Sequence, residues 1–238
     1  KNLWKEYGAV LKEGLYEDAE RKETLLDLWR FSTNENDEIM SLSSYLEKMP
    51  KNQKDIYYIS AETRSQALAS PHLEGFKSKN IPILIMTDAI DQFWLPMIGS
   101  FKDKKFTSIT QGQINLDDLD ENNKDKKSKN KGQKDKQDKE FVDLIAQMKV
   151  VLGEQVKDIR LSSKLTDSPV CLVADDGDMD IAMEQLMAQR DTNDKGAPRI
   201  LEINGDHSLI KNMKSLLSKK ENNDLVSDAG TLLFEQAR

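Results

Sequence analysis

Cysteine and long apolar runs are both scarce in this sequence. Its 238 residues include a single cysteine, Cys171, which cannot form a disulfide within the chain and fits a reducing compartment. No apolar run approaches the roughly 20 residues that a membrane-spanning helix needs, and no basic-then-apolar leader opens the chain. We therefore expect a cytoplasmic protein with no membrane partner.

The local motifs of common enzymes are missing as well. There is no Walker loop, no dinucleotide-binding glycine fingerprint and no Gly-x-Ser-x-Gly elbow. The two histidines, His72 and His207, stand far apart in the sequence and have no metal-ligand spacing with Cys171. We therefore expect no catalytic residue, no metal site and no cofactor in this chain.

The charge balance argues against a nucleic-acid partner. The formal net charge is −7, which disfavours a surface that binds phosphate groups over the whole chain. The lysines between 124 and 139 are diluted by Asp125, Asp135 and Asp138, and no aromatic residue among them could stack on a base. A solvated segment is the favoured interpretation of these lysines.

That lysine-rich segment is also free of apolar residues. From Glu121 to Glu140 the chain contains none of the side chains that build a core. Such a segment cannot bury enough apolar surface to offset the entropy lost on ordering. We therefore predict a flexible charged linker over 113–140 that separates two domains.

Before this linker, helical and strand patterns alternate. Residues 1–50 have a helical pattern, in which Ser41 or Ser43 could cap a short helix that ends near Pro50. The predicted strands that follow are 56–60, 83–86 and 104–110, and the helical segments between them are 62–79 and 88–100. This order predicts a small three-layer α/β domain over 51–112 with a mainly parallel sheet.

After the linker, residues 141–238 predict a mixed α+β domain that ends in amphipathic helices. The predicted strands are 156–162, 170–174 and 200–203, and the predicted helices are 141–152, 179–190, 209–217 and a last one from Leu225. Gly153 is well placed to stop the first of these helices.

Two aspartates after the second strand allow two interpretations. Asp88 and Asp91 stand at the carboxyl end of a buried strand, where open α/β sheets bind ligands. They could hold Mg²⁺ or accept a phosphoryl group, which would make the chain a magnesium- or phosphate-dependent enzyme. Helix capping by Asp88, with Asp91 at the positive end of the helix dipole, is the favoured interpretation.

The helix predicted at 179–190 carries an unusual methionine stripe. Met179, Met183 and Met187 recur every four residues, with Leu186 beside them and polar residues on both flanks. Methionine is flexible and polarizable and suits surfaces that must fit many partners. Ordinary core packing is the alternative, and it is the favoured one from the stripe alone. The aspartates at 175–180 favour the start of this helix through its dipole.

Apolar residues on two other helices raise the same question of core or contact. Phe93 and Trp94 are adjacent in a helix and point about 100° apart, so both cannot easily face one core. In the last helix the apolar positions need a partner surface, supplied by a second copy of the chain or by the preceding helix. These positions are Leu225, Val226, Ala229, Leu232 and Leu233.

Several motifs together resemble the heat shock protein 90 chaperone family in its bacterial form, high-temperature protein G. Residues 6–14 are similar to the helical segment that precedes the last subdomain of the middle domain in that family. The motifs that resemble this subdomain are Ile56-Tyr57-Tyr58-Ile59, Ser70-Pro71-His72-Leu73-Glu74 and Asp88-Ala89-Ile90-Asp91. Those that resemble the C-terminal domain are 156–161, 165–169, 201–204 and Asp206-His207.

The resemblance implies a non-catalytic piece of an ATP-driven dimeric clamp that binds unfolded or partly folded client proteins. ATP and magnesium would belong to the parent protein, because the nucleotide-binding domain would lie outside this chain. Client contacts carried over from the family fall on Met179, Met183, Leu186 and Met187, and on Gln92 and Phe93 beside Trp94. The family has an acidic residue where Gln92 stands. Dimerisation would use the last helix, from Leu225 to Leu233, while the final helix of the family would be missing.

Overall fold

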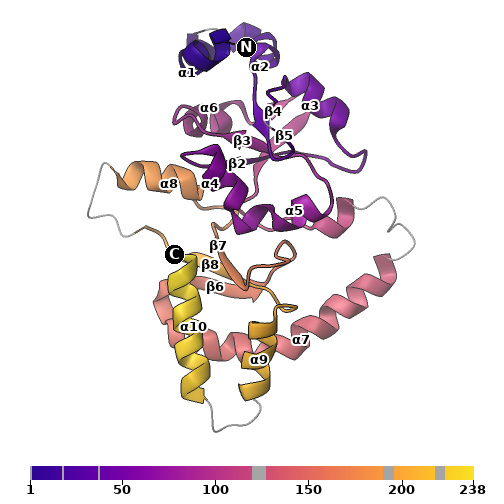
Figure 1. Cartoon of the computed structure of the whole chain (residues 1–238), viewed down its shortest axis with the longest axis vertical. Coiled ribbons are helices and arrows are strands. Elements are labelled where there is room, and N and C mark those ends of the chain that lie inside the picture. Colours follow the sequence, from indigo (N-terminus) through magenta and orange to yellow (C-terminus); the bar gives the residue numbers. More distant parts are fainter. Residues whose placement is uncertain (1, 18, 37, 120–126, 190–195, 218–222) are drawn as a thin grey trace. The chain divides into compact units, whose positions relative to one another are not determined.

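The chain is a mixed α/β protein with two separate sheets (Figure 1). The computed structural model describes residues 2–17, 19–36, 38–119, 127–189, 196–217 and 223–238. Two compact units divide the chain, the first formed by Lys1–Ile109 with Ala182–Thr192 and the second by Thr110–Ile181 with Asn193–Arg238. The described residues 182–189 therefore cluster with the first unit, whereas the sequence-based division placed them in the domain 141–238.

The lead-in of the first unit is helical with one interruption. It contains α1 (Asn2–Glu17), the 3-10 helix η1 (Ala19–Arg21), α2 (Lys22–Leu28), β1 (Ser32–Thr33) and α3 (Leu42–Lys48). The predicted capping of α3 is confirmed for Ser41, whose side chain accepts a hydrogen bond from the backbone N–H of Ser44. The strand β1 was not predicted, because two residues are too short to show a period.

The sheet of the first unit has the strand order β1-β3-β2-β5-β4. Its strands β2 (Ile56–Ser60), β3 (Leu84–Met86) and β5 (Lys104–Ser108) are parallel, which confirms the prediction. The edge strands β1 and β4 (Ser100–Phe101) are antiparallel to their neighbours and were missed. The connecting helices are α4 (Arg64–Ala69), η2 (Pro71–Leu73), α5 (Glu74–Ser78) and α6 (Asp91–Ile98).

Helices contact both faces of this sheet. Tyr58 and Leu84 belong to one buried cluster with Trp94 of α6 and with side chains of α1, α2 and α3. Tyr57 points to the other face and packs its ring 5.3 Å from that of Phe76 of α5. The alternation follows from the two-residue period of strands, and it explains why the central strands β2 and β3 are mostly apolar.

The segment 113–140, predicted as a flexible linker, contains buried residues and helical structure where the structure describes it. Ile114, Leu116 and Leu119 are buried, with Leu116–Leu119 forming the 3-10 helix η3. Helix α7 spans Lys127–Leu152 and so begins inside the predicted linker; residues 120–126 lie outside the described residues. The apolar stripe after residue 140 provides a stable helix, and the lysines, glutamines and glutamates before it are residues that propagate helices well.

The second unit packs helices on a three-stranded sheet. Its strand β8 (Arg199–Ile203) lies between β6 (Val156–Leu161), to which it is parallel, and β7 (Val170–Val173), to which it is antiparallel. The 3-10 helix η5 (Gly153–Gln155) follows α7, and Gly153 has a φ of 51°, a conformation that favours glycine at the end of a helix. One core cluster joins the sheet to α7, α9 (Ser208–Leu217) and α10 (Asn223–Ala237).

Candidate functional site

Helix α8 carries the methionine stripe and leaves half of it exposed. The helix spans Ile181–Ala188, so Met179 lies in the loop before it rather than in the predicted first turn. The exposed fractions are 48% for Met179 and 41% for Met187, while Met183 and Leu186 are half-buried. No residue within Ile181–Ala188 is fully buried. Core packing, the alternative favoured from the stripe alone, therefore does not describe Met179 and Met187.

The acidic loop before α8 is held by side chains of the second unit. Lys157 forms ion pairs with Asp175 at 2.8 Å and Asp178 at 2.9 Å. Hydrogen bonding to Lys157 lowers the pKa of Asp175, and the same contact raises the pKa of Lys157. The side-chain amide of Gln111 donates to the backbone carbonyl of Asp178 at 2.7 Å. Within the described residues, no group of three or more His, Cys, Asp or Glu side chains is placed to hold a metal ion.

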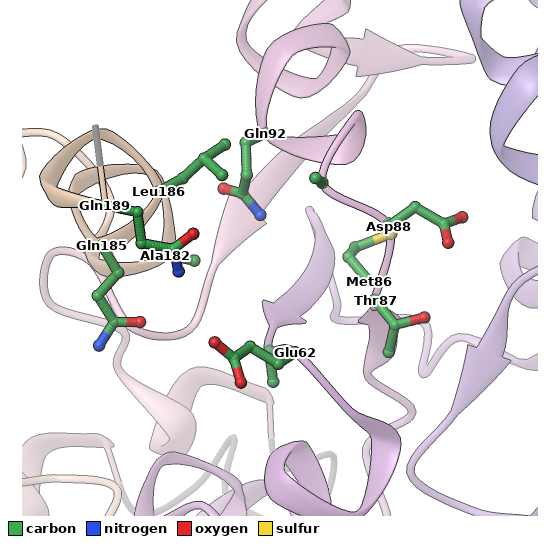
Figure 2. A pocket seen from close by; sticks show the side chains of 11 residues that line it. Glu62, Met86, Thr87, Asp88, Gln92, Ala182, Gln185, Leu186 and Gln189 are labelled. Carbon is green, nitrogen blue, oxygen red and sulfur yellow. The ribbon is translucent and has the colours of Figure 1, made fainter.

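A pocket of about 300 Å³ lies between α8 and the carboxyl ends of β2 and β3 (Figure 2). This is the edge of the sheet at which the sequence placed its candidate ligand residues. The lining residues are Ala61, Glu62, Met86, Thr87, Asp88, Ala89, Gln92, Ala182, Gln185, Leu186 and Gln189. Sequence reasoning missed the combination, because these residues come from segments far apart in the chain and no local period connects them.

Asp88 and Asp91 bind a buried lysine and do not cap α6. The amino group of Lys12 lies 2.7 Å from Asp88 and 2.6 Å from Asp91, which also accepts a hydrogen bond from the Trp94 indole at 2.7 Å. The residue at the cap position of α6 is Ile90, and no side chain caps the helix there. The predicted capping by Asp88 is therefore wrong. Lys12 was missed, since it is distant in the sequence.

Burial and charge oppose each other at Asp91. Burial raises the pKa of Asp91, while the ammonium group of Lys12 and the hydrogen bond from Trp94 lower it. Lys12 itself is 3% exposed. The ammonium group supplies to the two carboxylates the positive charge that Mg²⁺ would have supplied in the magnesium-enzyme hypothesis. The pair thus has a structural explanation that needs no ligand.

The three predicted contact residues of α6 lie in different surroundings. Trp94 is fully buried and packs its ring 5.2 Å from that of Trp29, so the prediction that Trp94 contacts clients is wrong. Phe93 and Gln92 are half-buried, and Gln92 lines the pocket. Of the two neighbours of Trp94 in the helix, Leu95 is buried with it and Phe93 lies on the partly exposed side.

The predicted dimer residues of α10 divide between two faces. Val226 and Leu233 are buried in the core of the second unit, and Ala229 packs against that core. Leu225 and Leu232 are 56% and 71% exposed. For Val226, Ala229 and Leu233, packing within the chain accounts for their apolar character. Only Leu225 and Leu232 remain as exposed members of the predicted interface.

Comparison with known proteins decides the family. The sequence model of the family described as "Hsp90 protein" matches residues 1–238. The chain belongs to the Hsp90 family. Two similar relatives, both called "Chaperone protein HtpG", come from Roseobacter denitrificans, with 39% identity over 238 residues, and Streptomyces coelicolor, with 36% identity over 236 residues. Each alignment covers 99% of this Hsp90-family chain.

The chain spans less than two-fifths of the length of these Hsp90-family relatives. The alignments cover 38% of the Roseobacter protein and 36% of the Streptomyces protein. A third relative of the same name, from Psychromonas ingrahamii, is 39% identical over 238 residues, which are 36% of its length. Among the described residues of this chain, no helix is both long and apolar enough to cross a membrane.

Proposed function

We propose that this chain is the client-binding part of a chaperone and that its principal client contact is the methionine surface of α8. This surface consists of Met179, Met183, Leu186 and Met187. The observation that carries the proposal is the exposure of Met187, at 41%, on a helix with no fully buried residue, together with that of Met179, at 48%, in the loop before it. Flexible thioether side chains can fit the varied apolar stretches of partly folded proteins.

Two further contacts complete the proposal. Phe93, half-buried on α6, supplies a second apolar contact beside Gln92. Leu225 and Leu232 stand seven residues apart on α10 and share one exposed face, which we assign to homodimerisation of the parent protein. The relatives' printed name, "Chaperone protein HtpG", supports a chaperone role.

The parent protein would be a cytoplasmic, ATP-driven dimeric clamp. In this proposal ATP and magnesium bind outside the present chain, which contributes client binding and self-association rather than catalysis. Helix α10 then represents one part of the dimer contact.

The test is binding of a fluorescently labelled, permanently unfolded protein to the full chain, followed by anisotropy. The variant Met179→Ser, Met183→Ser, Met187→Ser should weaken binding by about tenfold, because three apolar contacts are removed from the interface. Val150→Ser is the matched control, since Val150 is 80% exposed on α7 and lies outside the proposed surface.

The thermal midpoints of both variants must match that of the parent chain before their affinities are compared. Loss of binding by the methionine variant alone supports the proposal. Unchanged binding by a folded methionine variant would contradict it and direct attention to Phe93. Equal loss by Val150→Ser would show that exposed apolar area in general, rather than α8, decides binding.

A further inference from the structure

The pocket beside α8 is lined by several polar side chains without a hydrogen-bond partner among the described residues. Within the described residues, the side chains of Glu62, Gln92, Gln185 and Gln189 make no hydrogen bond or ion pair. Figure 2 shows Glu62 on one side of the pocket and two glutamines on the other, Gln185 on α8 and Gln189 just after it. A carboxylate and the carbonyl oxygens of three amides therefore stand ready to accept hydrogen bonds around one cavity.

The charge of this pocket has one sign. Its lining contains two carboxylates, Glu62 and Asp88, and no lysine, arginine or histidine. Asp88 is paired with Lys12 at 2.7 Å, which leaves Glu62 as the exposed carboxylate without a cation. A bound group with a positive charge would restore the balance, and it could donate to the Glu62 carboxylate and to the oxygens of the glutamine amides, whose N–H groups would be left for other partners.

Apart from Thr87, the rest of the lining is apolar. Met86, at 1% exposed, and Ala61 lie at the strand ends, and Ala89, Ala182 and Leu186 complete the apolar lining. A volume of about 300 Å³ stands at the lower end of the range for small-molecule pockets, so it suits one side chain better than a larger ligand. Lysine and arginine combine an aliphatic stem with a cationic head, and these two parts match the apolar and the acceptor-lined parts of the pocket.

The position of the pocket connects it with the methionine surface. Leu186 lines the pocket, and the next residue, Met187, is 41% exposed on the same helix. An extended chain that places a basic side chain in the pocket would therefore bring the neighbouring residues to α8. An apolar neighbour could then contact Met187.

We propose that this pocket binds the lysine or arginine side chain of a client segment in which a basic residue stands next to apolar ones. This inference rests on the proposed function and names the class of segment that α8 would select. The carboxylate of Glu62 would attract the cationic head, and the glutamine oxygens would orient it.

The experiment compares the affinities of two labelled, unstructured peptides for the full chain. Both contain the same leucines and differ only in carrying lysine or glutamine beside them. The lysine peptide should bind about fivefold more tightly than the glutamine peptide at low salt. This difference corresponds to the upper end of what one exposed ion pair contributes. Glu62→Gln should remove this preference without changing the affinity for the glutamine peptide. Gln189→Lys, which places a cation in the pocket, should reverse it.

Glu23→Gln is the control for net charge, because it removes the same charge from an exposed position on α2 outside the pocket. If Glu23→Gln lowers the preference as much as Glu62→Gln, the overall charge of the chain is responsible and the inference is overturned. Equal binding of both peptides to the parent chain would overturn the inference while leaving the proposed function intact. Binding of neither peptide, together with no binding of the unfolded protein, would overturn both.

Discussion

At the residue scale, the most consequential contact is the pairing of Lys12 with two aspartates. Its partners come from more than 70 positions further along the chain, so the contact ties α1 to the start of α6. Lys12 and Asp91 are both almost fully shielded from water, which makes each dependent on the other. Removing one member of a buried pair leaves the other charge without compensation.

Lys12→Met should destabilise the first unit by about 3 kcal/mol. The loss is expected near the lower end for broken buried pairs, because burial already raises the pKa of Asp91 and eases its protonation. Urea unfolding followed by tryptophan fluorescence measures the effect. The signal is specific to this unit, since all three tryptophans, Trp4, Trp29 and Trp94, lie in it.

The control for this prediction is an exposed ion pair. Lys211 and Asp206 lie 3.1 Å apart with side chains 55% and 78% exposed. Lys211→Met should cost less than about 1 kcal/mol, measured by far-ultraviolet circular dichroism because the second unit lacks tryptophan. Similar small losses for both lysine variants would show that the Lys12 contact contributes little to folding.

At the scale of the element, α10 is a helix with apolar side chains on two faces. Val226 and Leu233 pack into the core, while Leu225 and Leu232 stand exposed on another face. Both pairs are separated by seven residues, close to two helical turns, so each pair shares a face. Stability and self-association should therefore depend on different residues of the same helix.

The double variant Leu225→Ser, Leu232→Ser should keep the stability of the second unit within about 0.5 kcal/mol, as is usual for surface changes. It should also shift the protein toward the monomer in sedimentation velocity. Leu233→Ala should instead cost about 2–5 kcal/mol, the range for deleting a buried leucine side chain. Unchanged sedimentation of the double variant across the accessible concentrations would remove α10 from the proposed dimer contact.

At the scale of the whole molecule, each unit has its own core. Every buried residue in the main core cluster of the first unit lies between Leu15 and Phe101. Helix α8 belongs to this unit as well, although the chain reaches it only after passing through most of the second one. The core of the first unit is therefore local in sequence, but its candidate site is not.

A fragment of residues 1–112 should fold without α8. We expect cooperative urea unfolding by tryptophan fluorescence, because the core residues are all present. The same fragment should fail to bind the unfolded protein, since it lacks the methionines and one wall of the pocket. Binding by the folded fragment with the affinity of the full chain would place the client contact on α6 instead.

The sequence by itself determined much of the local structure. The strand patterns predicted at 56–60, 83–86 and 104–110 correspond to the three strands that form the parallel part of the first sheet. Ser41 and Gly153 marked a helix start and a helix end correctly. The family motifs carried the assignment that the comparison confirms. These features depend on residues near one another in the chain, where a period or a cap can be recognised.

Tertiary structure alone decided which apolar and charged residues are exposed. A helical stripe has the same sequence pattern whether it faces a core or a partner. The exposure of Met187 and the burial of Trp94 therefore could not be predicted from the sequence. Asp91 is the first residue of α6, as the sequence indicated, but its buried partner Lys12 is too distant in the chain to be recognised there. The pocket lined by Glu62, Gln185 and Gln189 forms only when segments distant in the chain fold together. No local sequence pattern could therefore predict it.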